Sequence, residues 1–502
     1  MRKLITVVGL VGAVAAVRAR PCEGADWPGW RGADRDGRSP DTGLLKAWPD
    51  GGPRLLWKAT DIGKGFSSVA VAGGVVYISG DIGNEQSLHA YDLAGRKAWS
   101  VKHGPGWEGR RSPGAMGSPV VAGGKVYLLS GNGLLKCYDA KTGAEKWSKE
   151  LVRDFGGKQQ GWGYSESPLI YKTLCIVKPG GSKCIVALNK DTGATVWTST
   201  GLSDDPAWSS CIAVEFQGQP LIITTVGKRM VGVDARTGQL LWENRRAVGG
   251  AACTTPVCSD GYVFSATGYG NGGACVRLSL AGGKVTATQV WETKDMICHH
   301  GGFIVHEGHI YGNHEGGWNC LDLKTGEKKW GGRGVGKGSV CYADGMLYTF
   351  GEGGGRMGLV HAKPDGFQEA GQFRVQGRAQ SWAYPVVVGG RMYVRYDTNL
   401  YVYDVRGPGY REAPVAAPKR EPKPKPAVSR PKPKPMPRRE ARPDTSDERA
   451  RRLWNSARNF LANNLNSLAE KKLKDLVEKY PDSEYAAKAR DKLKELAAAE
   501  DE

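Results

Sequence analysis

A motif of the form Asp-x-x-Thr-Gly-x-x-x-Trp recurs along the chain and constrains the fold more than any other feature of the sequence. Clear copies cover residues 139–147, 189–197 (with Asn in place of Asp), 234–242 and 322–330, and looser copies end at other tryptophans. The tryptophans that end the units are Trp57, Trp99, Trp147, Trp197, Trp242, Trp291 and Trp330, at intervals of 39 to 50 residues. An internal period of this length is typical of propellers and other repeat folds.

Each unit contains the signals of four short strands. Alternating apolar residues predict the strands, and Gly-Gly or Asp-Gly pairs between them supply the positive φ angles of tight hairpin turns. The fourth strand follows the Thr-Gly turn and contains the tryptophan. Glycine is accordingly abundant, at 72 of 502 residues. Four short antiparallel strands in each unit predict the blade of an all-β propeller.

Counting copies of the first hairpin gives eight blades. Their second strands are centred on Tyr77, Tyr127, Leu174, Leu221, Val263, Tyr311, Tyr348 and Tyr393. The eighth copy stops at Val402-Tyr403-Asp404-Val405 without a tryptophan strand, whereas residues 54–57 (RLLW) precede the first full hairpin. We therefore expect residues 54–57 to complete the eighth blade, so that the two ends of the domain close the ring.

These repeats resemble those of pyrroloquinoline-quinone (PQQ)-type propellers, which include quinoprotein alcohol dehydrogenases and the propeller lipoprotein of the outer-membrane β-barrel assembly machinery. The opening DWPGWRGADRDGRSP (residues 26–40) and residues 299–330 resemble the exported PQQ-like proteins of planctomycetes. The resemblance covers about residues 26–405. It implies an eight-bladed propeller of four-stranded antiparallel blades, with the repeated tryptophans docked between blades through the ring and its N–H group.

The two ends of the sequence predict export and a modular tail. Arg2 and Lys3 precede an apolar run at residues 4–17, which is typical of a secretory signal peptide over residues 1–25. The propeller is expected over residues 26–413, and the mature protein in the periplasm, the cell envelope or outside the cell. No later apolar run is long enough for a membrane helix.

Residues 414–445 contain ten prolines and ten basic residues and predict an extended linker with affinity for an anionic cell-wall or membrane surface. Residues 446–502 return to helical spacing and resemble tetratricopeptide-like units, so we expect a small helical module that binds envelope proteins. The formal charge is +19, but residues 1–25 and 414–445 hold 14 basic and only four acidic residues of the total. This terminal charge, without a nucleic-acid-reading motif, argues against a nucleic-acid partner.

The residue just before each first strand is expected to face the central channel of the propeller. Alignment of the blades places there Phe66, Met116, Ser165, Trp208, Cys253, His300, Lys337 and Trp382. The adjacent Glu166 and His299 are expected to join this ring, and Glu315 is a further candidate. Aromatic, imidazole and ammonium groups in one funnel favour a binding site for a small ligand.

Five of the eight histidines lie between His299 and His314, with Cys298, Glu315 and Cys320 nearby. Three interpretations stay open at this point: ordinary polar residues, a functional pair at His299 and His300, or a structural metal site. Strand alternation argues against one metal cluster, so no metal ligand is assigned. The ten cysteines from Cys137 to Cys341 form no CxxC or adjacent pair, which favours buried thiols, although pairing is not deducible from spacing.

The resemblance leaves the chemistry open. A PQQ-dependent dehydrogenase holds calcium through several oxygen ligands beside the quinone, and needs a carboxylate base. The candidate funnel offers two carboxylates and two imidazoles, and the adjacent cysteine pair typical of those enzymes is absent. We therefore expect no cofactor and no catalytic residue, and a non-catalytic binding or scaffold protein of the envelope. A PQQ-dependent dehydrogenase and a carbohydrate or cell-wall binding module are the alternatives.

Overall fold

The computed structural model describes residues 26–109, 113–245 and 251–411, and in the C-terminal part 446–447, 450, 453–454, 457 and 466–498. The chain divides into two compact units near residue 418. The predicted signal peptide and the predicted linker therefore lie outside the described residues. Within the described part of the chain, every helix is too short or too polar to cross a bilayer.

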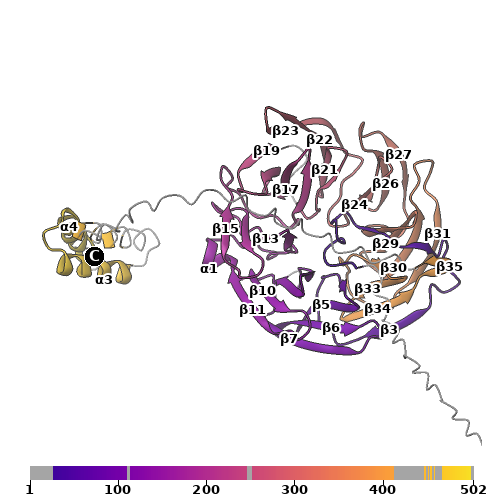
Figure 1. Cartoon of the computed structure of the whole chain (residues 1–502), viewed down its shortest axis with the longest axis horizontal. Coiled ribbons are helices and arrows are strands. Elements are labelled where there is room, and N and C mark those ends of the chain that lie inside the picture. The colour runs from indigo at the N-terminus through magenta and orange to yellow at the C-terminus, as the bar shows by residue number, and fades with distance from the viewer. Residues whose placement is uncertain are drawn as a thin grey trace, which may run out of the picture. The chain divides into compact units, whose positions relative to one another are not determined.

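The first unit is a ring of eight four-stranded antiparallel sheets, as the repeat predicted (Figure 1). Blades one to four comprise β4 (Ala70–Ala72), β5 (Val75–Ile82), β6 (Glu85–Asp92) and β7 (Lys97–Pro105); β8 (Val120–Ala122), β9 (Lys125–Leu129), β10 (Leu134–Asp139) and β11 (Glu145–Glu150); β12 (Leu169–Tyr171), β13 (Leu174–Val177), β14 (Val186–Asn189) and β15 (Thr195–Thr198); and β16 (Ile212–Phe216), β17 (Gln219–Val226), β18 (Arg229–Asp234) and β19 (Leu240–Asn244). A short helix, α1 (Leu151–Phe155), follows β11.

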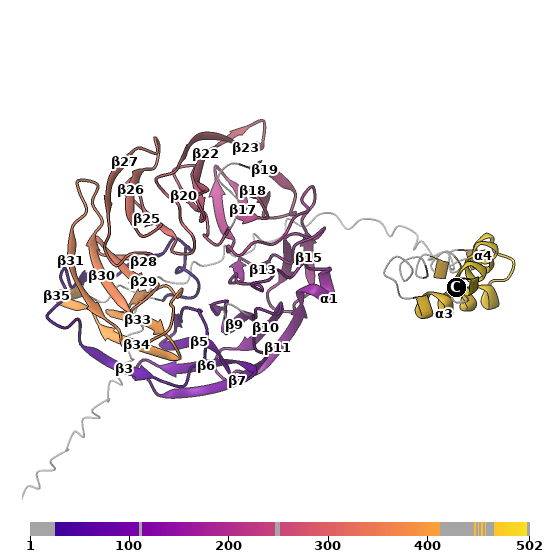
Figure 2. The same cartoon turned by 180° about the vertical axis from the view of Figure 1, so that it is seen from behind.

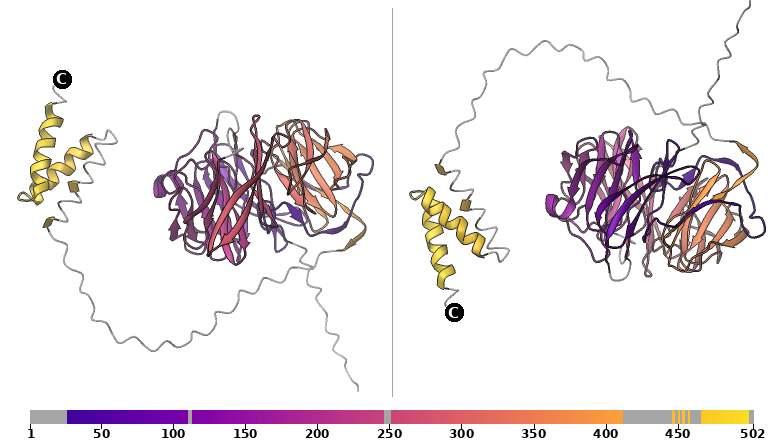
Figure 3. Two further views of the ribbon diagram at one scale, coloured as in Figure 1. Left: turned by 90° about the horizontal axis from the view of Figure 1, so that it is seen from above. Right: turned by 90° about the horizontal axis from the view of Figure 1, so that it is seen from below.

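The second half of the ring repeats this order. Blades five to eight comprise β20 (Val257–Ser259), β21 (Tyr262–Thr267), β22 (Gly272–Ala281) and β23 (Lys284–Thr293); β24 (Phe303–His306), β25 (His309–His314), β26 (Gly317–Asp322) and β27 (Lys328–Gly332); β28 (Gly338–Ala343), β29 (Met346–Gly351), β30 (Arg356–His361) and β31 (Glu369–Arg374); and β32 (Val386–Val388), β33 (Arg391–Tyr396) and β34 (Asn399–Asp404), with β3 (Leu55–Ala59) as its fourth strand. In the side views of Figure 3, the strands run between the two faces of the ring.

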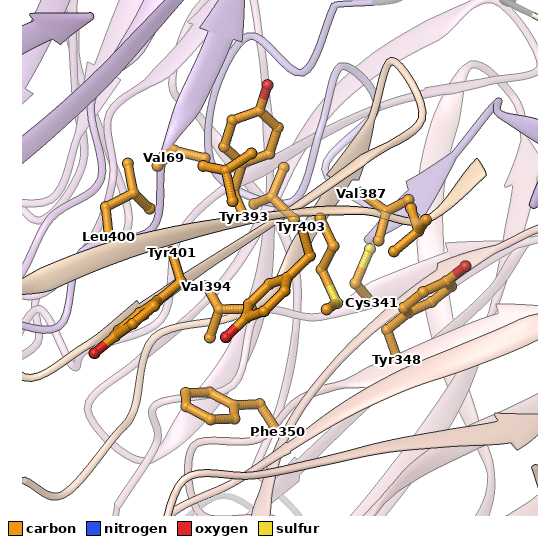
Figure 4. Packing of buried hydrophobic residues seen from close by; sticks show 14 of the residues in the cluster. Val69, Cys341, Tyr348, Phe350, Val387, Tyr393, Val394, Leu400, Tyr401 and Tyr403 are labelled. Carbon is orange, nitrogen blue, oxygen red and sulfur yellow. The ribbon is translucent and has the colours of Figure 1, made fainter. Parts of the chain in front are cut away.

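The predicted closure of the ring is confirmed. Strand β3 pairs antiparallel with β34, with Trp57 opposite Val402, and the two strands lie together at the rim in Figure 2. The core around this blade joins the eighth blade to its neighbours through Tyr393, Tyr348 and Val69 (Figure 4). The first and the last of the blade strands in sequence order, β3 and β34, thus share one sheet.

The repeated tryptophans connect each blade to the next. The indole N–H of Trp147 donates to the carbonyl oxygen of Lys190 at 3.0 Å, and its ring lies against Gly193, the glycine of the next Thr-Gly turn. The same donation to the next blade is made by Trp57, Trp99, Trp197, Trp291 and Trp330. The motif therefore pairs glycine with tryptophan because each glycine turn receives the ring of the preceding blade.

Blade five lacks the Thr-Gly turn, and the docking changes there. Its β22–β23 hairpin closes instead through Gly282 and Gly283. The buried indole N–H of Trp242, which faces this blade from blade four, has no partner among the described residues. At this blade the docking therefore consists of the apolar contacts of the Trp242 ring, without the inter-blade hydrogen bond.

The first residues of the propeller cross the interior of the ring before the chain reaches its rim beside β35 (Arg406–Arg411). This N-terminal strap, residues 26–44, includes β1 (Arg38–Ser39) and β2 (Thr42–Leu44). Strand β1 pairs in parallel with β28 of blade seven, and β2 pairs with β35. The indigo chain beside β28 and β24 in Figures 1 and 2 is this strap.

Hydrogen bonds from the strap reach six further blades. They join Trp27 to Val71, Pro28 to Val121, Arg35 to Ser167, Trp30 to Thr255, Arg31 to Phe303 and Asp41 to Gly390. Arg31 and Arg35 are both buried. The strap therefore ties together seven of the eight blades on the axis of the ring.

The second unit contains two described helices, α3 (Asn466–Lys479) and α4 (Glu484–Ala498). They pack through Leu473, Leu476, Ala486 and Ala489, within the segment expected to be helical. Most of residues 448–465 of the expected helical module lie outside the described residues. A tetratricopeptide-like role for this unit stays a prediction.

Candidate ligand cavity

A cavity of about 200 Å³ lies at the centre of the propeller. Seven of the eight residues expected to face the channel line it: Phe66, Met116, Ser165, Trp208, Cys253, His300 and Trp382. They come from the segments that precede the first strands of seven blades, which places the cavity on the axis of the ring. The eighth residue, Lys337, stands behind this lining and contacts His299, which does line the cavity.

Six further residues complete the lining and were not expected from the alignment of the blades. They are Trp30, Trp162, Ser210, Ala251, Tyr269 and Tyr384. Trp30 belongs to the strap, so the strap forms part of the wall. Tyr269 is 72% exposed and stacks obliquely on His299 with ring centroids 4.9 Å apart. None of these six occupies the repeat position that identified the other lining residues.

The aromatic rings form a contiguous apolar surface. Phe66 and Trp382 stack with ring centroids 4.3 Å apart, and Trp162 meets Trp382 edge-on at 6.1 Å. Trp30 packs edge-on against Tyr384 at 4.6 Å. Such surfaces contribute most of the burial energy at ligand sites and offer flat faces to a bound molecule.

A chain of polar contacts holds one side of the cavity. The Lys337 ammonium lies 2.9 Å from Nδ1 of His299 and 3.0 Å from a carboxylate oxygen of Glu352. The same carboxylate accepts hydrogen bonds from the indole N–H of Trp382, at 2.7 Å, and from Gln380. The positive charge of Lys337 is therefore paired within the protein, and Trp382 is held in place by the same carboxylate.

His300 is the least satisfied polar group of the lining. Its side chain is 9% exposed, and neither ring nitrogen has a partner among the described residues. Burial, and then the charge of Lys337, lowers the pKa of His300 well below its usual value. The same two causes lower the pKa of His299 to about 4. Both imidazoles are therefore neutral near pH 7, and His300 offers one donor and one acceptor.

The expectations for Glu166 and Glu315 are wrong as regards the funnel. Glu166 is buried beside the lining, where its carboxylate accepts the backbone N–H of Lys178 at 2.5 Å. Burial raises its pKa, while the charges of Lys178 and Arg35 oppose that shift. Glu315 is exposed in the β25–β26 turn, with φ at 44°. Neither carboxylate lines the cavity.

The clustered histidines separate as strand alternation predicted. His306 and His309 flank the β24–β25 turn, where His306 contacts the hydroxyl of Tyr342 and His309 the carbonyl of Glu307. No group of three or more His, Cys, Asp or Glu side chains within the described residues could hold a metal ion. The ten cysteines from Cys137 to Cys341 are free thiols, and burial raises the pKa of Cys253, the one in the cavity lining, to about 12.

Comparisons with known proteins agree with this architecture. Residues 84–331, about half of the chain, match the family model described as outer membrane protein assembly factor BamB. No curated protein matches the sequence significantly. Among solved structures, BamB from Moraxella catarrhalis is 15% identical with a TM-score of 0.50, and the alignment covers 70% of this chain and 97% of that one.

Quinohemoprotein alcohol dehydrogenase from Comamonas testosteroni is 14% identical with a TM-score of 0.53, over 78% of this chain and 82% of that one. At such low identity these structural likenesses establish the fold alone. The first unit of this chain is therefore an eight-bladed β-propeller of PQQ-type repeats, with a sequence match to the BamB family model.

Proposed function

We propose that this protein is a non-catalytic binding protein of the cell envelope whose central cavity receives a small molecule or a small group of a partner. The observation that carries the proposal is the lining of the cavity, in which aromatic rings surround a neutral imidazole with two unsatisfied nitrogens. Binding sites are typically built in this way, from apolar walls and a few polar groups that fix orientation.

Placement in the envelope is supported by the sequence. The family model that matches residues 84–331 describes an outer-membrane assembly factor, and residues 1–25 are typical of a secretory signal peptide. The helical unit and the basic Pro-rich segment would then serve attachment to envelope proteins or to an anionic surface. In this proposal the ligand cavity and the attachment segments belong to separate parts of the chain.

The cavity does not fit a calcium-bound PQQ. Calcium prefers six to eight oxygen ligands, and PQQ is a tricarboxylate that needs cationic partners. No carboxylate lines the cavity in the described part of the chain, and Glu352, just behind it, is paired with Lys337 and Trp382. Cys253 has a thiol pKa of about 12, so it is not a ready nucleophile either. The donor groups present favour binding over alcohol oxidation.

The test compares ligand binding with reconstituted oxidation. The full chain and a Trp208→Ala variant are screened by thermal shift against a panel of small molecules, with Tyr262→Ala, half-buried outside the cavity lining, as the matched control. We expect at least one compound to raise the Tm of the wild type and of Tyr262→Ala but not of Trp208→Ala. Calcium-dependent binding of PQQ together with dye-linked oxidation of an alcohol would overturn the proposal.

A further inference from the structure

The charged and titratable groups around the cavity indicate the charge of the ligand that it can bind. The Lys337 ammonium contacts His299 of the lining, and it is already paired with Glu352 at 3.0 Å. His299 and His300 are neutral near pH 7 because they are desolvated. Among the described lining residues, an anionic ligand would therefore find an apolar site without a free counter-charge, which is strongly unfavourable.

The polar atoms of the lining that lack a hydrogen-bond partner indicate which groups an uncharged ligand needs to carry. The neutral ring of His300 presents one N–H donor and one nitrogen acceptor, both buried and unpartnered within the described residues. The indole N–H of Trp208, also in the lining, is a second unpartnered donor. Hydroxyl groups both donate and accept, so two hydroxyls on one molecule can satisfy all three sites.

The walls define the shape of the ligand. The stacked pair of Phe66 and Trp382, with Trp162 edge-on to it, leaves flat apolar faces around a space of about 200 Å³. A compact ring is the shape that such faces cover best. A flexible chain would lose more conformational freedom in the same volume.

We propose that the cavity binds an uncharged ring that carries at least two hydroxyl groups, oriented by His300 and Trp208. This inference rests on the proposed binding function and adds the class of ligand. A sugar unit and a dihydroxy-aromatic molecule share this chemistry. Hydroxylated rings with a carboxylate are excluded by the lack of a free cation in the described lining.

The test uses two pairs of probes. The two members of a pair are similar in size and differ in charge, and the two pairs represent the two possible ligands, a dihydroxy-aromatic molecule and a sugar unit. One pair is 3,4-dihydroxybenzamide and 3,4-dihydroxybenzoate, and the other is methyl glucoside and methyl glucuronide. Affinities for the full chain are measured by calorimetry and by tryptophan fluorescence. We expect the uncharged member of one pair to bind at least about tenfold more tightly than its carboxylate, and the pair that responds identifies the source.

Variants test the assigned donors. His300→Phe keeps the ring and removes both nitrogens, and we expect a loss of affinity of about tenfold or more because the hydroxyls lose buried partners. His309→Phe is the matched control, since His309 begins β25 beside the β24–β25 turn and is absent from the cavity lining. Trp208→Phe removes the indole N–H but keeps an aromatic ring, and it provides a second test if His300→Phe does not fold, as judged by its melting curve.

Carboxylates that bind as well as their neutral partners would overturn the inference, as would unchanged affinity in both His300→Phe and Trp208→Phe. Absence of binding by all four probes would also overturn it. In that case a compound from the thermal-shift panel whose effect depends on Trp208 would still support the proposed binding function. The two proposals therefore fail separately.

Discussion

The pairing of glycine with tryptophan in the repeat can be tested at one inter-blade contact. Gly193 has φ at 72°, and a Cβ atom built on it would lie 2.9 Å from the ring of Trp147 in the preceding blade. Gly124, in the β8–β9 turn, also has φ at 72°, but no atom lies within 4 Å of its Cβ position. An alanine at either site pays the left-handed backbone cost of about 1–2 kcal/mol.

Only Gly193→Ala also displaces an aromatic ring, which adds about 1–3 kcal/mol. We therefore expect Gly193→Ala to lower the free energy of unfolding by about 2–5 kcal/mol, and Gly124→Ala by about 1–2 kcal/mol. Urea unfolding followed by tryptophan fluorescence and by circular dichroism measures both losses. In a Trp147→Ala background the additional loss of Gly193→Ala should vanish. Equal losses for the two single variants would refute the packing explanation.

Three further predictions follow from other contacts. Trp197→Phe should cost about 0.5–1.5 kcal/mol more than Trp242→Phe in urea unfolding, because only Trp197 donates its N–H to a carbonyl; equal costs would contradict this. Trp57→Ala should destabilise the propeller by about 3–5 kcal/mol, whereas the exposed Val290→Ala should change it by less than about 0.5 kcal/mol; a small effect at Trp57 would count against ring closure through β3. Burial lowers the pKa of His103 to about 4, so the folded state binds fewer protons than the unfolded state between about pH 6.5 and 4, and stability falls as pH falls; from pH 7 to 5 this group should cost about 2 kcal/mol, and His103→Gln should flatten the profile measured by urea titrations.

The sequence predicted those parts of the molecule that the repeat encodes. Eight blades, the closing strand at Trp57 and the position of His300 on the axis all follow from alignment of repeated units. A repeat carries such information because every blade places equivalent residues at equivalent positions. The strap was not predicted because its residues occur once and bond to segments 44 or more residues away in the sequence.

The error at Glu166 has a local cause. Successive residues of an extended segment point to opposite sides, so Ser165 faces the cavity and Glu166 faces the interior. His299 and His300 both reach the cavity because the chain bends at this point before β24. Whether two residues adjacent in sequence both face the cavity thus depends on a bend in the backbone, which the spacing of residues does not predict.

The closure of the ring through β3 has a consequence for how the chain acquires its structure. Trp57 and Val402 are 345 residues apart in sequence, and bringing such distant segments together costs about 5 kcal/mol of chain entropy by the logarithmic loop law. Contacts of this sequence separation slow folding. Strand β3, the first blade strand to be synthesised, stays without its partner β34 until the last blade has been made. If the chain is exported, as proposed, it benefits from staying unfolded until most of its length has been translocated, and its edge strand needs protection from other chains during that interval.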